Sequence, residues 1–216
     1  NNSLSKSQED FILSFNNFLS DDSKQAYILN GYAGTGKTFI TSQVINYLDN
    51  HGWLIHFLTP TGRSAKVANE QLKNDNIKAK TIHRGIYHSS GDIYYCDNEF
   101  CSYEIYISSK DIDIKKPIFP ICSKKTEKDV KLFKKRSFEL QSVDKVWSDG
   151  NFVDISEKKK IIFVDESSMV SNQENFSEVT FGSGKILNDL IEYSNIQTNA
   201  NNKIVFICDT AKLNPI

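Results

Sequence analysis

Hydrophobic residues follow two different periods along the chain. From Ser5 to Leu19 they recur every three or four residues, which predicts an amphipathic helix. From Lys160 to Asp165 they form one continuous run, which is typical of a strand buried on both faces. Strands and helices alternate over most of the chain, so we predict an α/β fold with a parallel sheet and helices on both faces. The predicted strands run from Gln25 to Asn30, Trp53 to Thr59, Lys160 to Asp165 and Lys203 to Asp209, and the predicted helices from Ser5 to Leu19, Lys37 to Leu48, Gly62 to Leu72 and Lys185 to Tyr193.

Residues 91–157 interrupt this alternation. Short runs rich in Tyr and Ile predict strands at 93–96 and 103–108, and two β-prone runs flank Asp149-Gly150, which predicts a hairpin. We therefore expect an α/β domain made of residues 1–90 and 158–216 that carries a small β-rich subdomain at 91–157. A lysine-rich run at 115–136 has two interpretations: it contacts a phosphate backbone, or it is a solvated face or loop.

Composition narrows the class of protein. Of the 216 residues, 39% are hydrophobic and 25% are charged, which predicts a folded chain. The net charge is −1, so contact with nucleic acid requires a local basic patch. The polar start of the chain resembles no signal peptide, and no apolar run reaches the length of a membrane helix; we expect a cytoplasmic protein without membrane contact. The four cysteines fit no common zinc pattern and are read as ordinary thiols.

A glycine-rich segment between the first predicted strand and the second predicted helix carries candidate chemistry. Residues 31–38 fit the pattern GxxxxGK[ST], whose glycines let successive backbone N–H groups face phosphates. Lys37 is expected to reach the β- and γ-phosphates and the Thr38 hydroxyl to bind Mg²⁺. The alternative, a chance glycine-rich turn, does not account for the strand and helix on either side. The predicted ATP site comprises Gly34, Thr35, Gly36, Lys37 and Thr38.

An acidic pair ends the third predicted strand. Asp165 and Glu166 follow four apolar residues, and the end of a buried strand lies beside such a phosphate loop. Asp165 is expected to hold Mg²⁺, and Glu166 to orient or deprotonate the attacking water. Acidic residues also end strands for reasons of solvation alone, but the phosphate loop favours the functional interpretation.

Gln8 has two interpretations that the residues leave open. Ser5 and Gln8 match the S-x-x-Q capping box that begins many helices. The Gln8 amide is also suited to reading the edge of adenine, since an amide pairs with adenine N6 and N7.

Taken together, the motifs resemble those of the N-terminal RecA-like motor domain of superfamily-1 helicases, in the RecD-like, 5′→3′ branch. The phosphate loop is similar to that family's G-x-AGTGKT, and Gln8 lies at the adenine-contacting position of its N-terminal motif. The resemblance covers roughly 1–90 and 158–216. Four further segments resemble family motifs: LTPTGRSAK at 58–66 (usually APTGRAAK), KTIHR at 80–84 (TIHR), VDESSMV at 164–170 (VDEASMV) and CDTAKLNPI at 208–216 (GDxxQLPPV).

The resemblance implies an ATP-dependent DNA helicase motor that moves on single-stranded DNA and acts at duplex junctions. It implies a catalytic role for Lys37 and Glu166, and it places Lys212 where the family has a γ-phosphate-sensing glutamine. A lysine contacts phosphate as a point charge but accepts no hydrogen bond from water. The hairpin around Asp149-Gly150 is either a wedge that splits duplex DNA or an ordinary surface hairpin. The expected contacts to the DNA strand are Thr61, Arg63, Thr81 and His83.

Two other functions fit the same motifs. The chain could be a nucleotide-gated DNA-binding or regulatory module, or the helicase subunit of an exodeoxyribonuclease complex with nuclease or repair subunits as partners. The motifs at 58–66 and 80–84 favour the helicase, because a generic NTPase does not need them. The 216 residues end just after the last motif, so we expect a second RecA-like domain, with its arginine finger, to be missing from this chain.

Overall fold

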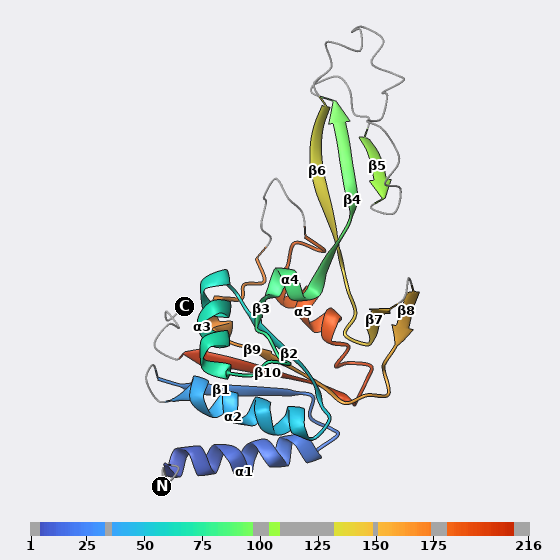
Figure 1. Ribbon diagram of the computed structural model, residues 1–216. Helices are drawn as coiled ribbons and strands as arrows, with labels where there is room; N and C mark the ends of the chain where they lie inside the picture. The colour runs from blue at the N-terminus through green and yellow to red at the C-terminus, as the bar shows by residue number, and fades with distance from the viewer. Residues whose placement is uncertain are drawn as a thin grey trace, which may run out of the picture.

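A five-stranded sheet forms the centre of the protein (Figure 1). This computed structural model describes residues 5–32, 36–96, 104–108, 132–148, 151–173 and 181–209. The strand order is β1-β10-β9-β2-β3, and all neighbouring strands are parallel, which confirms the predicted α/β fold. The strands of the sheet are β1 (Ala26–Gly31), β2 (Leu54–Thr59), β3 (Lys80–Thr81), β9 (Lys160–Val164) and β10 (Asn202–Asp209).

Helices cover both faces of this sheet. The chain alternates between strand and helix, so successive helices pack over the strands that they connect. One face is covered by α1, α2 and α3, and the other by α4 and α5. The helices are α1 (Lys6–Ser20), α2 (Lys37–Asn50), α3 (Gly62–Leu72), α4 (Ile82–Ile86) and α5 (Ile186–Ser194).

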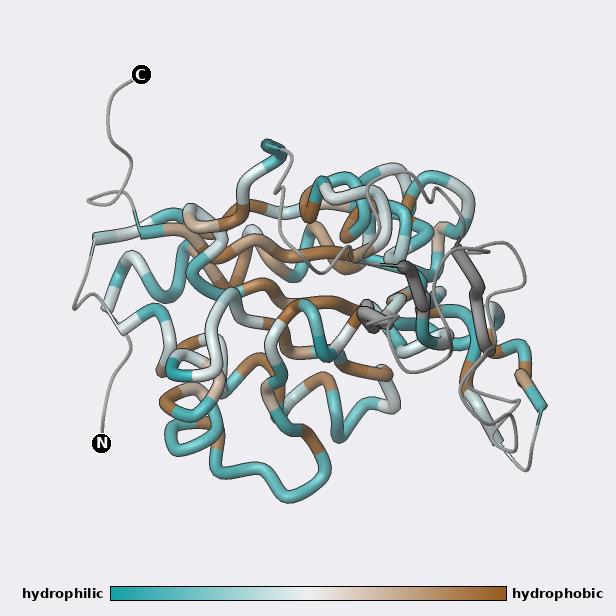
Figure 2. The backbone as a smooth tube through the Cα atoms, turned by 90° about the horizontal axis from the view of Figure 1, so that it is seen from above, coloured by the Kyte–Doolittle hydropathy of each residue, from teal (hydrophilic) through white to brown (hydrophobic). Residues whose placement is uncertain are grey.

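Two apolar layers result from the alternating side chains of the strands. On β9, Ile161 and Phe163 point to the layer under α1, α2 and α3, whereas Ile162 and Val164 point to the layer under α4 and α5. All four side chains are buried, which explains why the sequence of this strand is a continuous apolar run. Figure 2 shows the hydrophobic segments running through the middle of the fold.

The period of α2 predicts Tyr47 on the inner face, and this prediction is wrong. Tyr47 is 55% exposed, whereas Ile45 is fully buried in its place. The Tyr47 ring instead lies against the His51 ring in a tilted arrangement, with ring centroids 4.0 Å apart. The buried stripe of α2 is therefore rotated slightly from the one that the sequence suggests.

A buried lysine fixes the C-terminal end of α1 to the sheet. Lys203 on β10 is 2% exposed, and its ammonium donates hydrogen bonds to the carbonyls of Phe18, Asp21 and Lys24. The last carbonyls of a helix have no partner within the helix and carry partial negative charge, so they suit a cation. Lys203 thus sets the position of α1.

An arm of three antiparallel strands projects from the α/β core (Figure 1). It consists of β4 (Tyr87–Cys96), β5 (Glu104–Ser108) and β6 (Leu132–Leu140), with β4 in the centre. The two predicted strands correspond to parts of β4 and β5, whereas β6 was not predicted and occupies the end of the lysine-rich run. The rest of that run, 115–131, lies outside the described residues.

A separate hairpin follows the arm and matches the one predicted around Asp149-Gly150, two residues that are themselves outside the described part. Its strands β7 (Lys145–Ser148) and β8 (Asn151–Asp154) pair antiparallel. The Ile155 N–H donates to the Asp144 carbonyl and closes the base of the hairpin.

The junction between arm and hairpin packs on the α/β core. Val143 is 2% exposed, and its N–H donates to the Tyr193 carbonyl of α5. β4 also begins inside the core, at Tyr87, which is before the predicted boundary at residue 91. The division into two domains remains a prediction, and these contacts attach the junction to the α/β core.

Candidate nucleotide site

The phosphate loop connects β1 to α2 at the carboxyl edge of the sheet. Gly36 precedes the helix with a φ of 80°, a left-handed conformation that favours glycine. The helix begins at Lys37, so its free backbone N–H groups and positive end face the loop. Gly34 and Thr35 lie outside the described residues.

The Lys37 side chain folds back along the loop. Its ammonium donates hydrogen bonds to the carbonyls of Gly31 and Tyr32, the latter at 2.7 Å. These bonds hold a positive charge beside the N-terminal end of α2. A phosphate group bound at this end would lie within the field of both the helix and the ammonium.

The acidic pair follows β9, two strands away from β1 with β10 between them. The Asp165 N–H donates to the Leu58 carbonyl, and the Glu166 N–H donates to Asp165 Oδ1 at 2.9 Å. Glu166 has a φ of 48°, which is uncommon for a residue other than glycine and turns the chain sharply after the strand. Such conformations cluster at functional sites.

A serine that the motif analysis did not single out links this turn to β10. Ser167 begins the short 3₁₀ helix η1 (Ser167–Met169) and is buried. Its hydroxyl donates to the Ile207 carbonyl at 3.0 Å and lies 2.9 Å from Cys208 Sγ. In the sequence, only its position directly after the acidic pair indicated that Ser167 could link this turn to β10.

These segments enclose a cavity of about 750 Å³. Lys37 and the α2 N-terminus supply donors for phosphate, while Thr38 and Asp165 supply the oxygen ligands that Mg²⁺ prefers, so the residues fit a magnesium nucleotide. Asp209 at the end of β10 also lines the cavity and was missed as a site residue. The lining residues are Gly36, Lys37, Thr38, Phe39, Thr61, Arg63, Ser64, Val67, Ala68, Glu70, Gln71, Lys73, Asp165, Glu166, Ile207, Cys208 and Asp209.

Gln8 caps α1 and also lies beside the phosphate loop. Its Oε1 accepts a hydrogen bond from the Ser5 N–H, and the Ser5 hydroxyl accepts one from the Gln8 N–H, which confirms the capping box. Its Nε2 lies 3.4 Å from the point where a Cβ on Gly36 would stand. The capping role therefore holds the amide next to the nucleotide site and does not exclude the adenine contact.

The four residues expected on DNA lie at the start of α3 and around β3 and α4, and their contact with DNA remains a prediction. Thr61 and Arg63 line the nucleotide cavity, whereas Thr81 lines a second cavity. The His83 ring packs edge-on against Phe181, with centroids 4.7 Å apart, and its burial lowers the pKa of this histidine. Lys212 lies outside the described residues.

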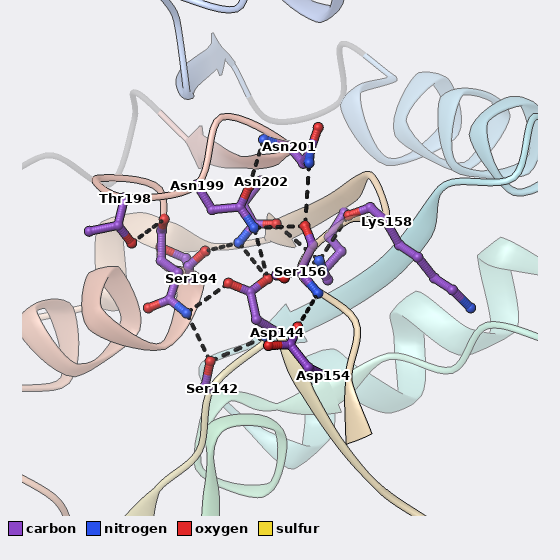
Figure 3. A network of polar contacts seen from close by, with 12 residues as sticks. Ser142, Asp144, Asp154, Ser156, Lys158, Ser194, Thr198, Asn199, Asn201 and Asn202 are labelled. Atoms are coloured by element: carbon purple, nitrogen blue, oxygen red, sulfur yellow. Dashed lines mark hydrogen bonds and ion pairs between the residues drawn. The ribbon is translucent and has the colours of Figure 1, made fainter. Parts of the chain in front are cut away.

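A buried ion pair lies at the opposite edge of the sheet, where β9 begins. Figure 3 shows the network of polar contacts around Asp144, the acidic partner of this pair. The fully buried Lys160 ammonium is 2.8 Å from Asp144 Oδ1. Burial alone would raise the pKa of Asp144, but hydrogen bonds from Lys160 and three asparagines outweigh it and lower the pKa to about 2. The asparagines that donate to Asp144 are Asn195, Asn199 and Asn202.

A partly buried histidine, His56, should make stability depend on pH. Burial lowers the pKa of His56 from 6.5 to about 4, and the charges of Lys80 and Lys160 act in the same direction. Between these two values the unfolded chain binds a proton that the folded chain does not, so stability falls as pH falls, by about 3 kcal/mol in all. Replacing His56 with Gln should remove this part of the decline in urea denaturation, whereas the exposed His51→Gln should not. An unchanged decline in His56→Gln would contradict this prediction.

The fold and the site define a phosphate-loop NTPase, with a parallel sheet, a loop that suits phosphates and an acidic pair in one cavity. The family model described as "AAA domain" matches residues 3–180, and the chain belongs to this family. The match supports a place among P-loop proteins of helicase-like type, but it does not single out the RecD-like branch.

One curated relative is an uncharacterized protein of Methanocaldococcus jannaschii, 45% identical over 75 residues. The aligned part is 34% of this chain and 6% of the relative, so the chain corresponds to a small part of that protein. Within the described residues, the structure contains no helix with the length and apolar character needed to cross a membrane.

Proposed function

We propose that the chain is the ATP-binding part of a DNA helicase motor of the RecD-like branch. The observation that carries this proposal is the joint position of Lys37 and the acidic pair in one cavity, together with motifs at 58–66 and 80–84 on neighbouring elements. ATP is the expected nucleotide and Mg²⁺ the expected ion. Single-stranded DNA is the expected partner, as the resemblance implies.

Each side chain has a separate task in this proposal. Lys37 binds the β- and γ-phosphates, and Thr38 and Asp165 hold Mg²⁺, which when bound neutralises charge on the phosphate oxygens. Glu166 orients the attacking water and accepts its proton. The backbone of the Asp165–Glu166 turn is fixed by its bonds to Leu58 and Asp165 Oδ1, so both carboxylates stay at the cavity.

The β7–β8 hairpin is the proposed contact to duplex junctions. Trp147 and Phe152 pair across its strands, with ring centroids 4.8 Å apart, and are 53% and 55% exposed. Val146 and Val153 pair on the other face and are also exposed. Exposed aromatic rings stack on bases at about 1–3 kcal/mol each, which supports this role.

Nucleotide binding is the first test. Replacing Lys37 with Ala should raise the dissociation constant for Mg-ATP by about 10- to 150-fold, because a charge-assisted hydrogen bond contributes about 1.5–3 kcal/mol. Isothermal titration calorimetry measures this change. Lys24→Ala removes an exposed lysine that precedes β1, at the other end of this strand from the loop, and serves as the matched control. Equal affinities for wild type and Lys37→Ala would rule out the phosphate site.

The helicase and the nucleotide-gated module differ in how single-stranded DNA affects ATP turnover. For the motor, ATP hydrolysis by the natural gene product should increase when single-stranded DNA is added. Binding of Mg-ATP with no effect of DNA on turnover would favour the gated module instead.

A further inference from the structure

The segment 181–184 packs against the root of the arm. It lies between the acidic turn and α5 in the chain, and α5 begins two residues later at Ile186. Phe181 forms an isolated bridge with Phe138 of β6, and the Gly182 N–H donates to the Phe138 carbonyl at 3.3 Å. The two phenyl rings also stack, with centroids 4.4 Å apart. One short segment thus holds the end of β6 both by its backbone and by a side chain.

The same phenyl ring also contacts the start of the arm. The centroid of the Phe181 ring lies 4.7 Å from that of His83 on α4 and 5.4 Å from that of Tyr87. Tyr87 is 4% exposed and begins β4 directly after the end of α4. Aromatic rings at such separations attract each other beyond the effect of the area that they bury. Phe181 therefore lies against both strands by which the arm joins the α/β core.

A buried carboxylate of α5 joins this segment to β4. Asp189 is 2% exposed and accepts hydrogen bonds from the Tyr87 hydroxyl and from both the N–H and the hydroxyl of Ser183. These donors satisfy a carboxylate that would be costly to bury alone. Gly182 has a φ of 48°, and a Cβ there would lie 2.3 Å from Asp189 Oδ2, so the close approach requires glycine. We call this group of residues the arm clip: Phe181, Gly182, Ser183 and Asp189.

The pairing of the arm strands changes just beyond the arm clip. β4 and β6 pair in register from Tyr87 and Leu140 to Ser89 and Phe138, and a β-bulge then follows between Ser89 and Gly91. A bulge bends a strand pair and changes its direction. Figure 1 shows the arm projecting from the core beyond this point. Because β4 has ten residues, the arm extends about 30 Å, and a rotation of about 10° at its root would move its tip by about 5 Å.

We propose that the arm clip fixes the direction of the arm on the α/β core, and that the motor needs this fixed direction to separate the strands of a duplex. A force on the tip of a long arm acts at its root, so an arm with a loose root swings without separating strands. Phe181 and Asp189 are positioning residues, and neither lines the nucleotide cavity. The second part of this inference rests on the proposed function, because strand separation is an activity of the motor.

Pulsed electron spin resonance tests the first part. One spin label stands at Lys134 on β6 and the other at Glu192 on α5, each attached to a genetically encoded keto amino acid so that the native cysteines remain. Wild type should give one narrow distribution of distances between the labels. Phe181→Ala should broaden this distribution about twofold or more, because the ring that lies against both arm strands is removed. Phe181→Tyr keeps the ring and should restore the width of wild type.

Two activities of the natural gene product test the second part. Unwinding of a forked duplex should fall by about 2- to 30-fold in Phe181→Ala. ATP hydrolysis with single-stranded DNA and the dissociation constant for Mg-ATP should stay within about twofold of wild type. Gly182→Ala should give the same pattern, because its new Cβ would push against Tyr87 and Asp189. The matched control, Leu19→Ala, removes a partly buried apolar side chain under the other face of the sheet and should unwind like wild type.

The outcomes separate the arm clip from the proposed motor. If Phe181→Ala does not fold, Tyr87→Phe, which removes a single hydroxyl, should shift both measurements in the same direction by a smaller factor. A wild-type distance distribution or a wild-type rate of unwinding in the clip variants would show that the arm clip is wrong, and the motor would stand. An equal loss of unwinding in Leu19→Ala would assign the effect to stability and also overturn the clip. If wild type neither hydrolyses ATP nor unwinds the duplex, the motor fails, and the label distances alone decide whether the clip holds the arm.

Discussion

Replacing Asp144 with Asn is expected to destabilise the protein by about 3–5 kcal/mol, because it leaves a buried charge without its partner. The Lys160 ammonium is fully buried, and Asp144 is the carboxylate that it contacts, at 2.8 Å. The new amide would also place an N–H₂ group among asparagine side chains that now donate to Asp144. A loss of this size is a large part of the total stability of a typical domain.

Urea denaturation followed by tryptophan fluorescence measures this loss. Asp75→Asn is the matched control, because Asp75 pairs with Lys78 on the surface at 3.9 Å and should contribute less than about 1 kcal/mol. The double variant Asp144→Asn/Lys160→Met removes both the unpaired charge and its partner and should recover much of the stability. A free energy of unfolding for Asp144→Asn within about 1 kcal/mol of wild type would show that Lys160 is satisfied by its other contacts.

The sheet could be predicted from sequence because its strands have a local signature. A strand buried on both faces is a continuous apolar run, and β9 and β10 both have this form. The strand β6 has no such signature. Its segment LFKKRSFEL alternates poorly and is rich in lysine, and it is a strand because it pairs with β4 along nearly its whole length. That pairing is between segments far apart in sequence, which a local pattern does not show.

The nucleotide site could be predicted because its motif specifies the backbone. The loop, the α2 N-terminus and the acidic turn all follow the ends of parallel strands, which meet at one edge of the sheet. The motifs did not predict on which face of α3 each of their residues lies. Arg63 and Thr81 belong to two motifs that are close in sequence, yet they line different cavities because α3 stands between them.

The buried ion pair also had no signal in the sequence. Lys160 stands at the polar start of an apolar run, where a lysine is usually solvated, and Asp144 precedes a hairpin as many surface aspartates do. Their contact depends on how the base of the β7–β8 hairpin packs on the sheet. Asp144 fixes one end of that base, and Ser156 fixes the other. The Ser156 carbonyl accepts hydrogen bonds from the side chains of Asn199 and Asn201.

Replacing Glu166 with Gln is expected to lower ATP turnover by about 10²- to 10⁴-fold while Mg-ATP still binds. The glutamine side chain has nearly the same shape but accepts no proton, so it can position water without activating it. The backbone at this position has a φ of 48°, which Glu and Gln tolerate equally, and the bond from its N–H to Asp165 Oδ1 does not involve the side chain. Folding and nucleotide binding should therefore be preserved.

Steady-state ATP hydrolysis by the natural gene product, with single-stranded DNA present, measures the loss of turnover, and calorimetry measures the retained binding. Glu192→Gln changes an exposed glutamate on α5 and should turn over ATP like wild type. If the Glu166→Gln variant keeps ATP turnover within about twofold of wild type, another group accepts the proton from the attacking water. Asp209 is then the next carboxylate to replace, because it lines the same cavity at the end of β10.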